Sequence, residues 1–565
     1  MTEQSVTVGV VGLGSLGLAC AELLTGAGIP VIAVDCDPAA VARAQARSIP
    51  VATEISALSG AGLVIEAVTE DPEVKSSVLR TVAAACAPDT VLVSTTASLS
   101  LPALATASGR PTKLVGLRLL VPPVAGTGFE VVATTMSEPD ALDTLRALLG
   151  RLPVREKTFG PARQLAWDLL LGYLNRSVAL YEAGYATRED IDTAMRLGCG
   201  LPAGPLELLD RIGLDTVEAG LVDLHRRSGR AAHAPAPLLT AMVARQEVGR
   251  KVGKGIYDYQ PSGAVVPPTT ANLADEATPR PVERVGIVGS GTMAQGIAQV
   301  TALGGLDTIL VARTQDKAEV AVEAIDAALV RAVRRGQISP DQRRAALARL
   351  HPSSTFTDLG DRDLVLEAVA EDDDVKAEIF GRLDRVCRPG AILTTTTSSL
   401  SVGDCAEATG RRGDVLGMHF FNPAPAMGLV EVCRTKFTEE DVVATAHVLA
   451  RSLGKTPVDC SDRAGFIVNY LLFPYLNDAV LLVEAAAADI EDIDAAVASG
   501  LGYPLGPFAL MDAIGLDVGE AIQRRLHEVN HDPDVKPTVM LTELTRLGRL
   551  GRKVGAGFYH HPARR

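Results

Sequence analysis

The sequence predicts an α/β protein in which one unit occurs twice in tandem. GLPAGPLELLDRIGLD, starting at Gly200, returns as GYPLGPFALMDAIGLD at Gly502, and GRKVGKGIYDY at Gly249 returns as GRKVGAGFYHH at Gly551. Both offsets are 302 positions (502 − 200 and 551 − 249), and two long matches in one register indicate a duplication. Each copy also opens with an apolar strand, a glycine-rich turn and a helical stretch, which is typical of an α/β domain.

The composition is that of a globular chain with several domains. The 565 residues are 47% hydrophobic and 22% charged, enough for three or four domains. A net charge of −14 argues against nucleic-acid and anionic-membrane partners. The sequence begins without a targeting signal and has no run of about 18 apolar residues, so we expect a cytoplasmic protein with no membrane segment. The eight cysteines lack CxxC spacing, which predicts reduced thiols and no metal site.

The opening turn of each copy predicts a dinucleotide-binding domain of the Rossmann type. In copy one the turn is formed by Gly12, Gly14 and Gly17. In copy two the corresponding residues are Gly289, Gly291, Thr292, Met293 and Ala294. The first glycine permits a tight turn, the second lets backbone N–H groups approach a pyrophosphate, and the small third residue lets the helix pack on the strand. The helix N-terminus favours the negative charge of the phosphates.

The residues at the end of the second strand of each copy indicate whether that copy would bind NAD or NADP. Copy one has Asp35 there, where a carboxylate accepts hydrogen bonds from ribose hydroxyls and repels a 2′-phosphate, so any cofactor of copy one would be NAD. Copy two has Ala312 at this place, followed by Arg313. A guanidinium suits bidentate phosphate binding, which predicts NADP for copy two. NAD is the alternative, with Arg313 stacked on the adenine.

Four further motifs follow in copy two. They read LVLEAVAEDDDVK, TTTTSSLS, GMHFFNPAPAMGLVEV and RAGFIVNYLL. This series resembles the L-3-hydroxyacyl-CoA dehydrogenase family, and the resemblance covers nearly the whole chain, twice. It implies that each Rossmann-type domain is followed by an all-helical domain. The expected boundaries are 1-155 and 283-459 for the Rossmann-type domains, 156-260 and 460-565 for the helical domains, and 261-282 for a linker rich in Pro, Ala and Thr.

The resemblance also implies roles for single residues of copy two. His419 matches the family's catalytic base, and Glu431 matches the carboxylate that orients it. Ser398 and Asn469 match polar groups that position substrate and cofactor. The remaining matched positions, expected beside the cofactor, are Glu371 and Lys376.

These residue types suit the oxidation of a secondary alcohol. The hydroxyl proton must leave as hydride passes to the nicotinamide, and imidazole titrates close to neutral pH. A carboxylate such as Glu431 can fix the imidazole tautomer and stabilise the imidazolium. In the reverse direction, protonated His419 would return the proton to the 3-keto oxygen. These residues are consistent with what the resemblance implies, that copy two interconverts 3-hydroxyacyl-CoA and 3-ketoacyl-CoA.

Copy one lacks this set of residues. At an offset of 301, Arg118 replaces His419 and Ala97 replaces Ser398. The replacement for Asn469 is Trp167 or Asp168, and the residues that survive are Glu130, Glu70 and Lys75. Because arginine stays protonated, it is a poor general base, which predicts that copy one is catalytically silent. Arg118 would then either bind an anion or form a salt bridge with Glu130.

Copy two carries an insertion that copy one lacks, within residues 315-350. The offset grows from 277 at the glycine turns to 301 at Glu371, a difference of 24 residues (301 − 277). Gly336 and the pair Ser339–Pro340 predict two helices joined by a short turn. The family resemblance places an arm that grips CoA here, and the expected contacts are Arg331, Arg334 and Arg335. The alternative is a solvated charged face.

The expected partner is a small-molecule acyl-CoA, or a thioester presented by an acyl carrier protein. NADP use would favour reduction of a short 3-ketoacyl thioester. Two other functions stay open: a related dehydrogenase that acts on a free hydroxy acid or sugar acid, and an NAD(P)-binding regulatory or scaffold protein. The family pairs its helical domains, so the two halves are expected to form an intramolecular pseudo-dimer, with copy one as the scaffold.

Overall fold

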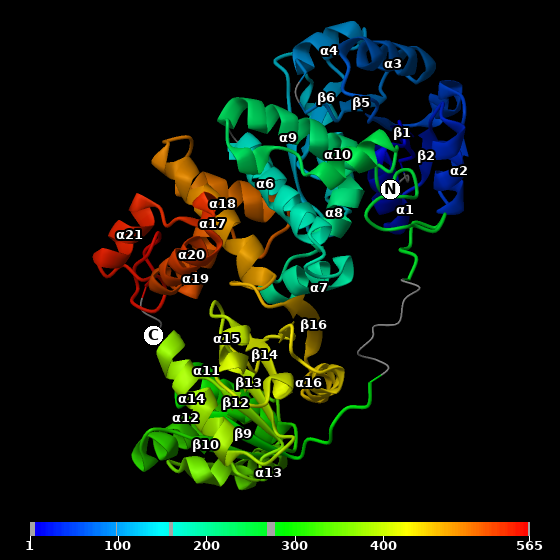
Figure 1. Cartoon of the computed structure of the whole chain (residues 1–565). Helices are drawn as coiled ribbons and strands as arrows, with labels where there is room; N and C mark the ends of the chain where they lie inside the picture. The colour runs from blue at the N-terminus through cyan, green and yellow to red at the C-terminus, as the bar shows by residue number, and fades with distance from the viewer. Residues whose placement is uncertain (1–5, 98, 158–161, 268–276, 563–565) are drawn as a thin grey trace.

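The structure, a computed structural model, describes residues 6–97, 99–157, 162–267 and 277–562 (Figure 1). Each half consists of an eight-stranded sheet with helices on its faces, followed by a helical domain. In Figure 1 the two helical domains lie between the two sheets. The predicted fold class is therefore confirmed, including the tandem duplication.

The first sheet has the strand order β3-β2-β1-β4-β5-β6-β7-β8 and is parallel except where β7 runs antiparallel to β6. Its strands are β1 Val8–Val11, β2 Val31–Val34, β3 Val51–Ala52, β4 Leu63–Glu66, β5 Val91–Ser94, β6 Leu114–Leu119, β7 Gly128–Val132 and β8 Arg155–Glu156. Its helices are α1 Ser15–Gly26, α2 Pro38–Ala46, α3 Pro72–Ala85, α4 Leu101–Ala107 and α5 Pro139–Leu149. Strands such as β1 and β5 are buried along their whole length, as expected for parallel strands covered on both faces.

The second sheet repeats this order as β11-β10-β9-β12-β13-β14-β15-β16, again with one antiparallel pair, β14 and β15. Its strands are β9 Arg284–Val288, β10 Asp307–Val311, β11 Leu350–Ser353, β12 Leu364–Glu367, β13 Ile392–Thr395, β14 Val415–Phe420, β15 Leu429–Arg434 and β16 Thr456–Ser461. Its helices are α11 Thr292–Leu303, α12 Gln315–Arg334, α13 Pro340–Ala348, α14 Asp373–Val386, α15 Val402–Glu407 and α16 Glu440–Ser452. The neighbours β9, β12, β13 and β14 are parallel, so their carboxyl ends share one edge, where ligands bind in such sheets.

The two helical domains use the same local construction. The first contains α6 Ala162–Glu182, α7 Arg188–Cys199, α8 Pro205–Ile212, α9 Leu214–Ser228 and α10 Pro237–Ala244. The second contains α17 Val468–Glu484, α18 Ile490–Gly500, α19 Pro507–Ile514, α20 Leu516–Asn530 and α21 Val539–Arg546. The short 3-10 helices among the described residues are Ile55–Gly60, Ala231–His233, Phe356–Leu359, Arg412–Asp414 and Pro533–Val535.

A buried aspartate explains why two strings are so closely repeated. Asp210 accepts hydrogen bonds from the N–H groups of Ile256 and Tyr257, both at 2.8 Å, so the first string is tied to the second. A Cβ on Gly255 would lie 2.1 Å from the Asp210 carboxylate, so only glycine fits there. Asp512 makes the same contacts with its own copy of the second string.

The helical domains pack against each other and against the opposite sheets. Helix α6 lies against α17 and α18, and one hydrophobic core runs through both helical domains. Helix α7 of copy one packs on β15 and β16 of copy two, and α18 of copy two packs on β7 of copy one. The approach is close, because a Cβ on Gly198 would lie 2.9 Å from Val468. Each half therefore covers part of the other half's sheet.

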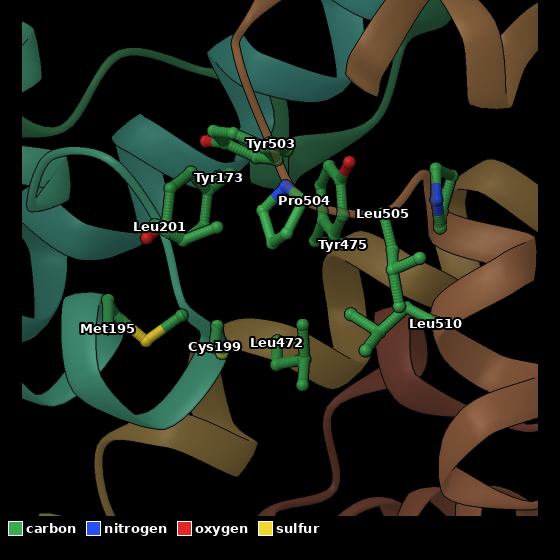
Figure 2. A pocket seen from close by; sticks show the side chains of 11 residues that line it. Tyr173, Met195, Cys199, Leu201, Leu472, Tyr475, Tyr503, Pro504, Leu505 and Leu510 are labelled. Atoms are coloured by element: carbon green, nitrogen blue, oxygen red, sulfur yellow. The ribbon is translucent and has the colours of Figure 1, made fainter. Parts of the chain in front are cut away.

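An apolar cavity lies at the junction of the helical domains (Figure 2). Its walls include Tyr173 and Met195 of copy one and Leu472, Tyr475 and Tyr503 of copy two. The rings of Tyr173 and Tyr475 are 6.0 Å apart.

Among the described residues, no helix is long and apolar enough to cross a membrane.

Candidate active site

His419 and Glu431 form a buried pair on adjacent strands. They face each other in the antiparallel register of β14 and β15, and Nδ1 of His419 lies 2.7 Å from Oε2 of Glu431. The histidine is 6% exposed and the glutamate is fully buried. A carboxylate bound to Nδ1 favours the tautomer with hydrogen on Nδ1, which leaves the lone pair on Nε2 free to accept a proton.

The start of α17 holds Glu431 from its other side. Oε1 of Glu431 accepts hydrogen bonds from the N–H groups of Ile467 at 3.0 Å and Val468 at 2.9 Å. These two donors stabilise the charged carboxylate and fix its direction. Sequence reasoning missed them, although the glycine of RAGFIVN was a signal. Gly465 has a φ of +84°, and its turn directs both N–H groups towards the carboxylate.

Two phenylalanines flank the histidine. The ring of Phe421 is 4.5 Å from the His419 ring in an edge-on arrangement, and the ring of Phe466 is 5.5 Å away. Phe466 is fully buried. Asn469 is the second residue of α17, directly after Val468, and is 8% exposed. The predicted base, its carboxylate and Asn469 are thus joined through one helix start.

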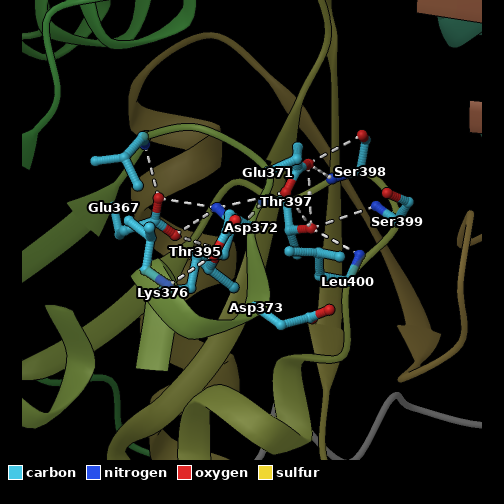
Figure 3. A network of polar contacts seen from close by, with 12 residues as sticks. Glu367, Glu371, Asp372, Asp373, Lys376, Thr395, Thr397, Ser398, Ser399 and Leu400 are labelled. Carbon is cyan, nitrogen blue, oxygen red and sulfur yellow. Dashed lines mark hydrogen bonds and ion pairs between the residues drawn. The ribbon is translucent and has the colours of Figure 1, made fainter. Parts of the chain in front are cut away.

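A second polar cluster contains Ser398 (Figure 3). Glu371 accepts hydrogen bonds from the N–H of Ser398 at 2.7 Å and from its Oγ at 3.1 Å. Thr397 donates to the same carboxylate at 2.9 Å. The Nζ of Lys376 lies 2.8 Å from Glu367 and 3.5 Å from Glu371, with its side chain 2% exposed. The described partners of Lys376 are therefore carboxylates, and Glu367 is a member that sequence reasoning missed.

Copy one keeps this cluster almost unchanged. Lys75 lies 2.7 Å from Glu66, and Glu70 accepts hydrogen bonds from Thr96 at 2.7 Å and from the N–H of Ala97 at 2.8 Å. Ala97 has the backbone contact of Ser398 but no hydroxyl. The cluster is also present in copy one, where the histidine is absent. Its contacts therefore hold the loop that follows β5 in copy one and β13 in copy two.

The counterpart of the histidine pair in copy one is an ion pair. Arg118 faces Glu130 in the same register of β6 and β7, with Nη1 and Oε2 3.6 Å apart. Arg163 donates to the carbonyl of Ala97 at 3.1 Å and also lies on this side of the sheet. Burial is the largest cause that lowers the pKa of Arg163, and the charge of Arg118 adds to it.

The structure resolves the counterpart of Asn469. Asn175 and Asn477 each donate to two carbonyls, those of residues 232 and 234 and those of residues 534 and 536, so the helices align at an offset of 302 (477 − 175). At this offset, Trp167 of copy one is the equivalent of Asn469 (469 − 302). Asp168 instead pairs with Arg227 at 2.8 Å.

The glycine turns have the geometry of a dinucleotide site. Gly289 has a φ of +135°, and a Cβ there would lie 2.4 Å from the carbonyl of Ala368. At Gly291, the residue that precedes α11, a Cβ would meet no described atom within 4 Å, so the turn is open towards a ligand. The residues that follow it, Thr292 and Met293, begin the helix. These features fit a bound pyrophosphate.

The residues expected beside the adenosine ribose of a cofactor differ between the two copies, as the sequence indicates. In copy one, Asp35 accepts hydrogen bonds from the N–H groups of Leu13 at 2.5 Å and Asp37 at 2.8 Å. Gly12 has a φ of +92°, and a Cβ on Gly17 would lie 1.9 Å from its carbonyl. Gly14 precedes α1. In copy two, Ala312 is buried and Arg313 is exposed just beyond β10.

The insertion of copy two forms two helices, α12 and α13. Ser339 and Gln342 make a capping box at the start of α13. The three arginines expected to bind CoA, Arg331, Arg334 and Arg335, are exposed at the C-terminal end of α12. Within the described part of the chain, none of the three pairs with a carboxylate. A helix C-terminus also favours cations, so their place is electrostatically stable without a ligand.

The described residues contain no group of histidine, cysteine or acidic side chains that could hold a metal ion. The eight cysteines are free thiols. A dinucleotide-binding sheet with a histidine–carboxylate pair at its carboxyl edge defines the dehydrogenase class of α/β proteins.

The chain belongs to the 3-hydroxyacyl-CoA dehydrogenase family. The family's NAD binding domain matches residues 44–158 and 284–463, and its C-terminal domain matches residues 168–259 and 465–561. In copy one the NAD-binding match begins beyond the glycine turn, whereas in copy two it includes Gly289. The resemblance inferred from the sequence is confirmed.

Several relatives match one half of the chain over nearly their own full length. A 3-hydroxybutyryl-CoA dehydrogenase of Mycobacterium tuberculosis is 43% identical over 280 residues, which are 49% of this chain and 98% of the relative. The mitochondrial hydroxyacyl-coenzyme A dehydrogenase of Sus scrofa is 39% identical over 50% of this chain and 91% of its own. The solved (S)-3-hydroxybutyryl-CoA dehydrogenase PaaH1 of Ralstonia eutropha is 36% identical with a TM-score of 0.48, covering 50% of this chain and 99% of that one.

Proposed function

We propose that copy two interconverts (S)-3-hydroxyacyl-CoA and 3-ketoacyl-CoA. The observation that carries this proposal is the buried pair of His419 and Glu431, with Nδ1 and Oε2 2.7 Å apart. Nε2 of His419 takes the proton of the 3-hydroxyl group as the C3–H bond breaks. A bound nicotinamide supplies the acceptor for the hydride. The product is the 3-keto thioester, and the imidazolium is stabilised by Glu431.

The other candidate site residues of copy two position the substrate and the cofactor rather than transfer a proton. Ser398 and Asn469 are neutral, so they can hydrogen-bond substrate oxygens without changing the charge of the site. Glu371 holds Ser398 by two hydrogen bonds. Lys376 pairs closely with Glu367 and lies near Glu371 inside the protein, and we assign it a supporting role on the cofactor side rather than a contact with phosphate.

Copy two is proposed to use NADP. Support comes from the loss of the ribose-binding carboxylate at Ala312 and from the exposed Arg313 beside it. With NADPH the reaction would run towards reduction of a short 3-ketoacyl thioester. Copy one retains Asp35, which would select NAD if copy one binds a nucleotide at all.

The substrate is proposed to be presented as a CoA thioester. Arg331, Arg334 and Arg335 form an exposed positive patch on a chain whose net charge is −14, and such a patch attracts the phosphates of CoA. A dehydrogenase for free hydroxy acids would not need this patch. The names of the relatives, which are hydroxyacyl-CoA dehydrogenases, favour the thioester as well.

Copy one is proposed to be a catalytically silent scaffold. Its Arg118 cannot serve as a base, and Ala97 and Trp167 replace two further polar groups. Its helical domain contacts that of copy two through α6 and α17, and this contact supports the proposal that the chain forms an intramolecular pseudo-dimer. Its helix α7 also covers β15, the strand that carries Glu431.

A steady-state assay tests this proposal. Acetoacetyl-CoA and free acetoacetate would each be offered with NADPH and with NADH. We expect turnover with the CoA thioester and a higher kcat/KM with NADPH. Equal turnover of the free acid would support the alternative hydroxy-acid dehydrogenase, and equal or better activity with NADH would overturn the assignment of Arg313.

A further inference from the structure

The two helical domains are joined by a cluster of ion pairs with an uneven distribution of charge. Arg176 Nη1 lies 2.6 Å from Asp532, and its Nη2 lies 3.2 Å from Asp534. Arg230 lies 2.7 Å from Asp478 and 2.7 Å from Asp534. Both arginines come from copy one, and all three aspartates come from copy two.

The paired positions are equivalent in the two copies. At the helical offset of 302, Arg176 corresponds to Asp478 (478 − 176) and Arg230 corresponds to Asp532 (532 − 230). We call 176 and 478 the first position and 230 and 532 the second position. The first position of each copy contacts the second position of the other copy, so this contact occurs twice. Copy one has arginine at both positions, and copy two has aspartate at both. Asp534, whose counterpart is Ala232, adds a further negative charge to copy two.

This arrangement has a consequence for pairing between like copies. Two copies of the second helical domain, docked in the same way, would place Asp478 against Asp532 in both contacts. Two copies of the first would place Arg176 against Arg230 in both. Like charges that meet across an interface destabilise it and are a common way to exclude a wrong partner. Only the pairing of unlike copies gives two attractive contacts.

The charges are sheltered enough for this effect to be large. The side chains of Arg176, Asp478, Asp532 and Asp534 are 15% to 18% exposed, and that of Arg230 is 30% exposed. Burial raises the pKa of Asp478 to about 6 even with Arg230 beside it. Salt screens such pairs less than it screens charges on an open surface. Tyr173 and Tyr475, which are equivalent at the offset of 302 (475 − 173), also meet across the interface with their rings 6.0 Å apart, and this contact carries no charge that would distinguish the copies.

We infer that this cluster is a specificity device, by which the helical face of copy two accepts the arginine-bearing face of copy one and rejects a second copy of itself. The inference rests on the proposed pseudo-dimer but not on the proposed reaction. In a dimer of two identical chains, the first position of each chain would meet the second position of its partner, so the two positions would have to carry opposite charges to attract. In this chain both positions of one copy carry the same charge, so the arginine-bearing copy is the partner that the face of copy two requires.

Exchange between halves of the folded chain tests the inference. A protease site placed in the linker, residues 261-282, lets the chain fold intact and then be cut. Two cut preparations, one isotopically heavy, are mixed and followed by native mass spectrometry. We expect only complexes of one copy-one half with one copy-two half. Complexes of two copy-two halves at a comparable level would overturn the inference.

Charge reversal provides the matched variants. Arg176→Asp with Arg230→Asp should weaken association of the cut halves by roughly 100-fold or more, because each contact then places aspartate against aspartate. Adding Asp478→Arg and Asp532→Arg restores opposite charges at the two equivalent contacts and should recover part of that loss, because Asp534 still faces both reversed positions. Recovery also shows that the reversed arginine positions still fold.

A neutral pair of substitutions, Arg176→Met with Arg230→Met, gives a second measure. It removes attraction without adding repulsion, so its loss should be smaller than that of the charge reversal. If reversal and neutralisation weaken the halves equally, or if the fourfold exchange recovers nothing, the cluster does not determine specificity. Dehydrogenase activity is not the readout, so a failure of the proposed reaction would leave this result unchanged.

Discussion

Glu431 accepts the Nδ1 hydrogen bond of His419 at 2.7 Å across two antiparallel strands, and in copy one the same register position is an arginine facing a glutamate. The same strand pair thus carries a histidine–carboxylate pair in copy two and an arginine–glutamate ion pair in copy one. The carboxylate is present in both copies. The identity of its partner distinguishes the half that we propose to be catalytic from the half that we propose to be silent.

The first prediction concerns Glu431. Glu431→Gln should lower kcat for 3-ketoacyl-CoA reduction by about 100-fold or more with little change in KM, because an amide neither stabilises the imidazolium nor fixes its tautomer. Glu130→Gln, the matched change in copy one, should leave both constants unchanged. An equal loss in both variants would mean that the two carboxylates act only on stability.

The second prediction concerns the turn before α17. Gly465→Ala places a side chain at a φ of +84° and 2.6 Å from Leu526, so we expect a cost of about 1–3 kcal/mol and a displaced helix start. Because Ile467 and Val468 then misdirect Glu431, kcat should fall as well. Gly305→Ala is a control, with a φ of +93° and no described atom near its Cβ. It should lower the unfolding midpoint without lowering kcat.

The third prediction concerns the cofactor. Arg313→Ala should raise KM for NADPH by about 10-fold and leave KM for NADH nearly unchanged, since the guanidinium would contact only the 2′-phosphate. Ala312→Asp should shift preference further towards NADH by restoring a ribose-binding carboxylate. Steady-state kinetics with each cofactor varied in turn measures both KM values. A parallel rise for both would indicate that Arg313 stacks on the adenine instead.

The fourth prediction concerns pH and the helical interface. Burial, with a smaller effect of Arg230, lowers the pKa of His233 to about 4, below the ordinary value of about 6.5. The folded state therefore favours the neutral ring, and this stability is complete above pH 6.5 and is lost as the pH falls through 4. His233→Gln should reduce the slope of unfolding free energy against pH in that window by up to about 1.4 kcal/mol per unit. Urea unfolding at several pH values checks this, with the exposed His560→Gln as control.

The features that could be read from the sequence are those set by local patterns. The duplication and the strand–turn–helix at each glycine turn followed from repeats and periodicity, and the all-helical second domains followed from the family resemblance. The contact of His419 with Glu431 followed from the family resemblance, and their spacing suits two strands joined by a loop. Arg118 and Glu130 were also expected to be able to pair, and they do.

The remaining features depend on which surfaces meet. Nothing local in α7 indicates that it lies on β15 of the other copy, since its contact residue Gly198 reads as an ordinary small residue. When the two copies are aligned, Arg176 of copy one corresponds to Asp478 of copy two. This reversal of charge can be interpreted only from the structure, which pairs Arg176 with Asp532. Burial of Lys376 among carboxylates likewise depends on the sheet edge that brings them together.

The central claim is that catalysis belongs to copy two alone. Steady-state reduction of acetoacetyl-CoA by the full chain, measured for His419→Gln and for the matched Arg118→Gln, tests it most directly. We expect the first variant to lose about 1000-fold or more in kcat and the second to keep the activity of the unmodified chain. Retained turnover in His419→Gln, or a comparable loss in Arg118→Gln, would contradict the account.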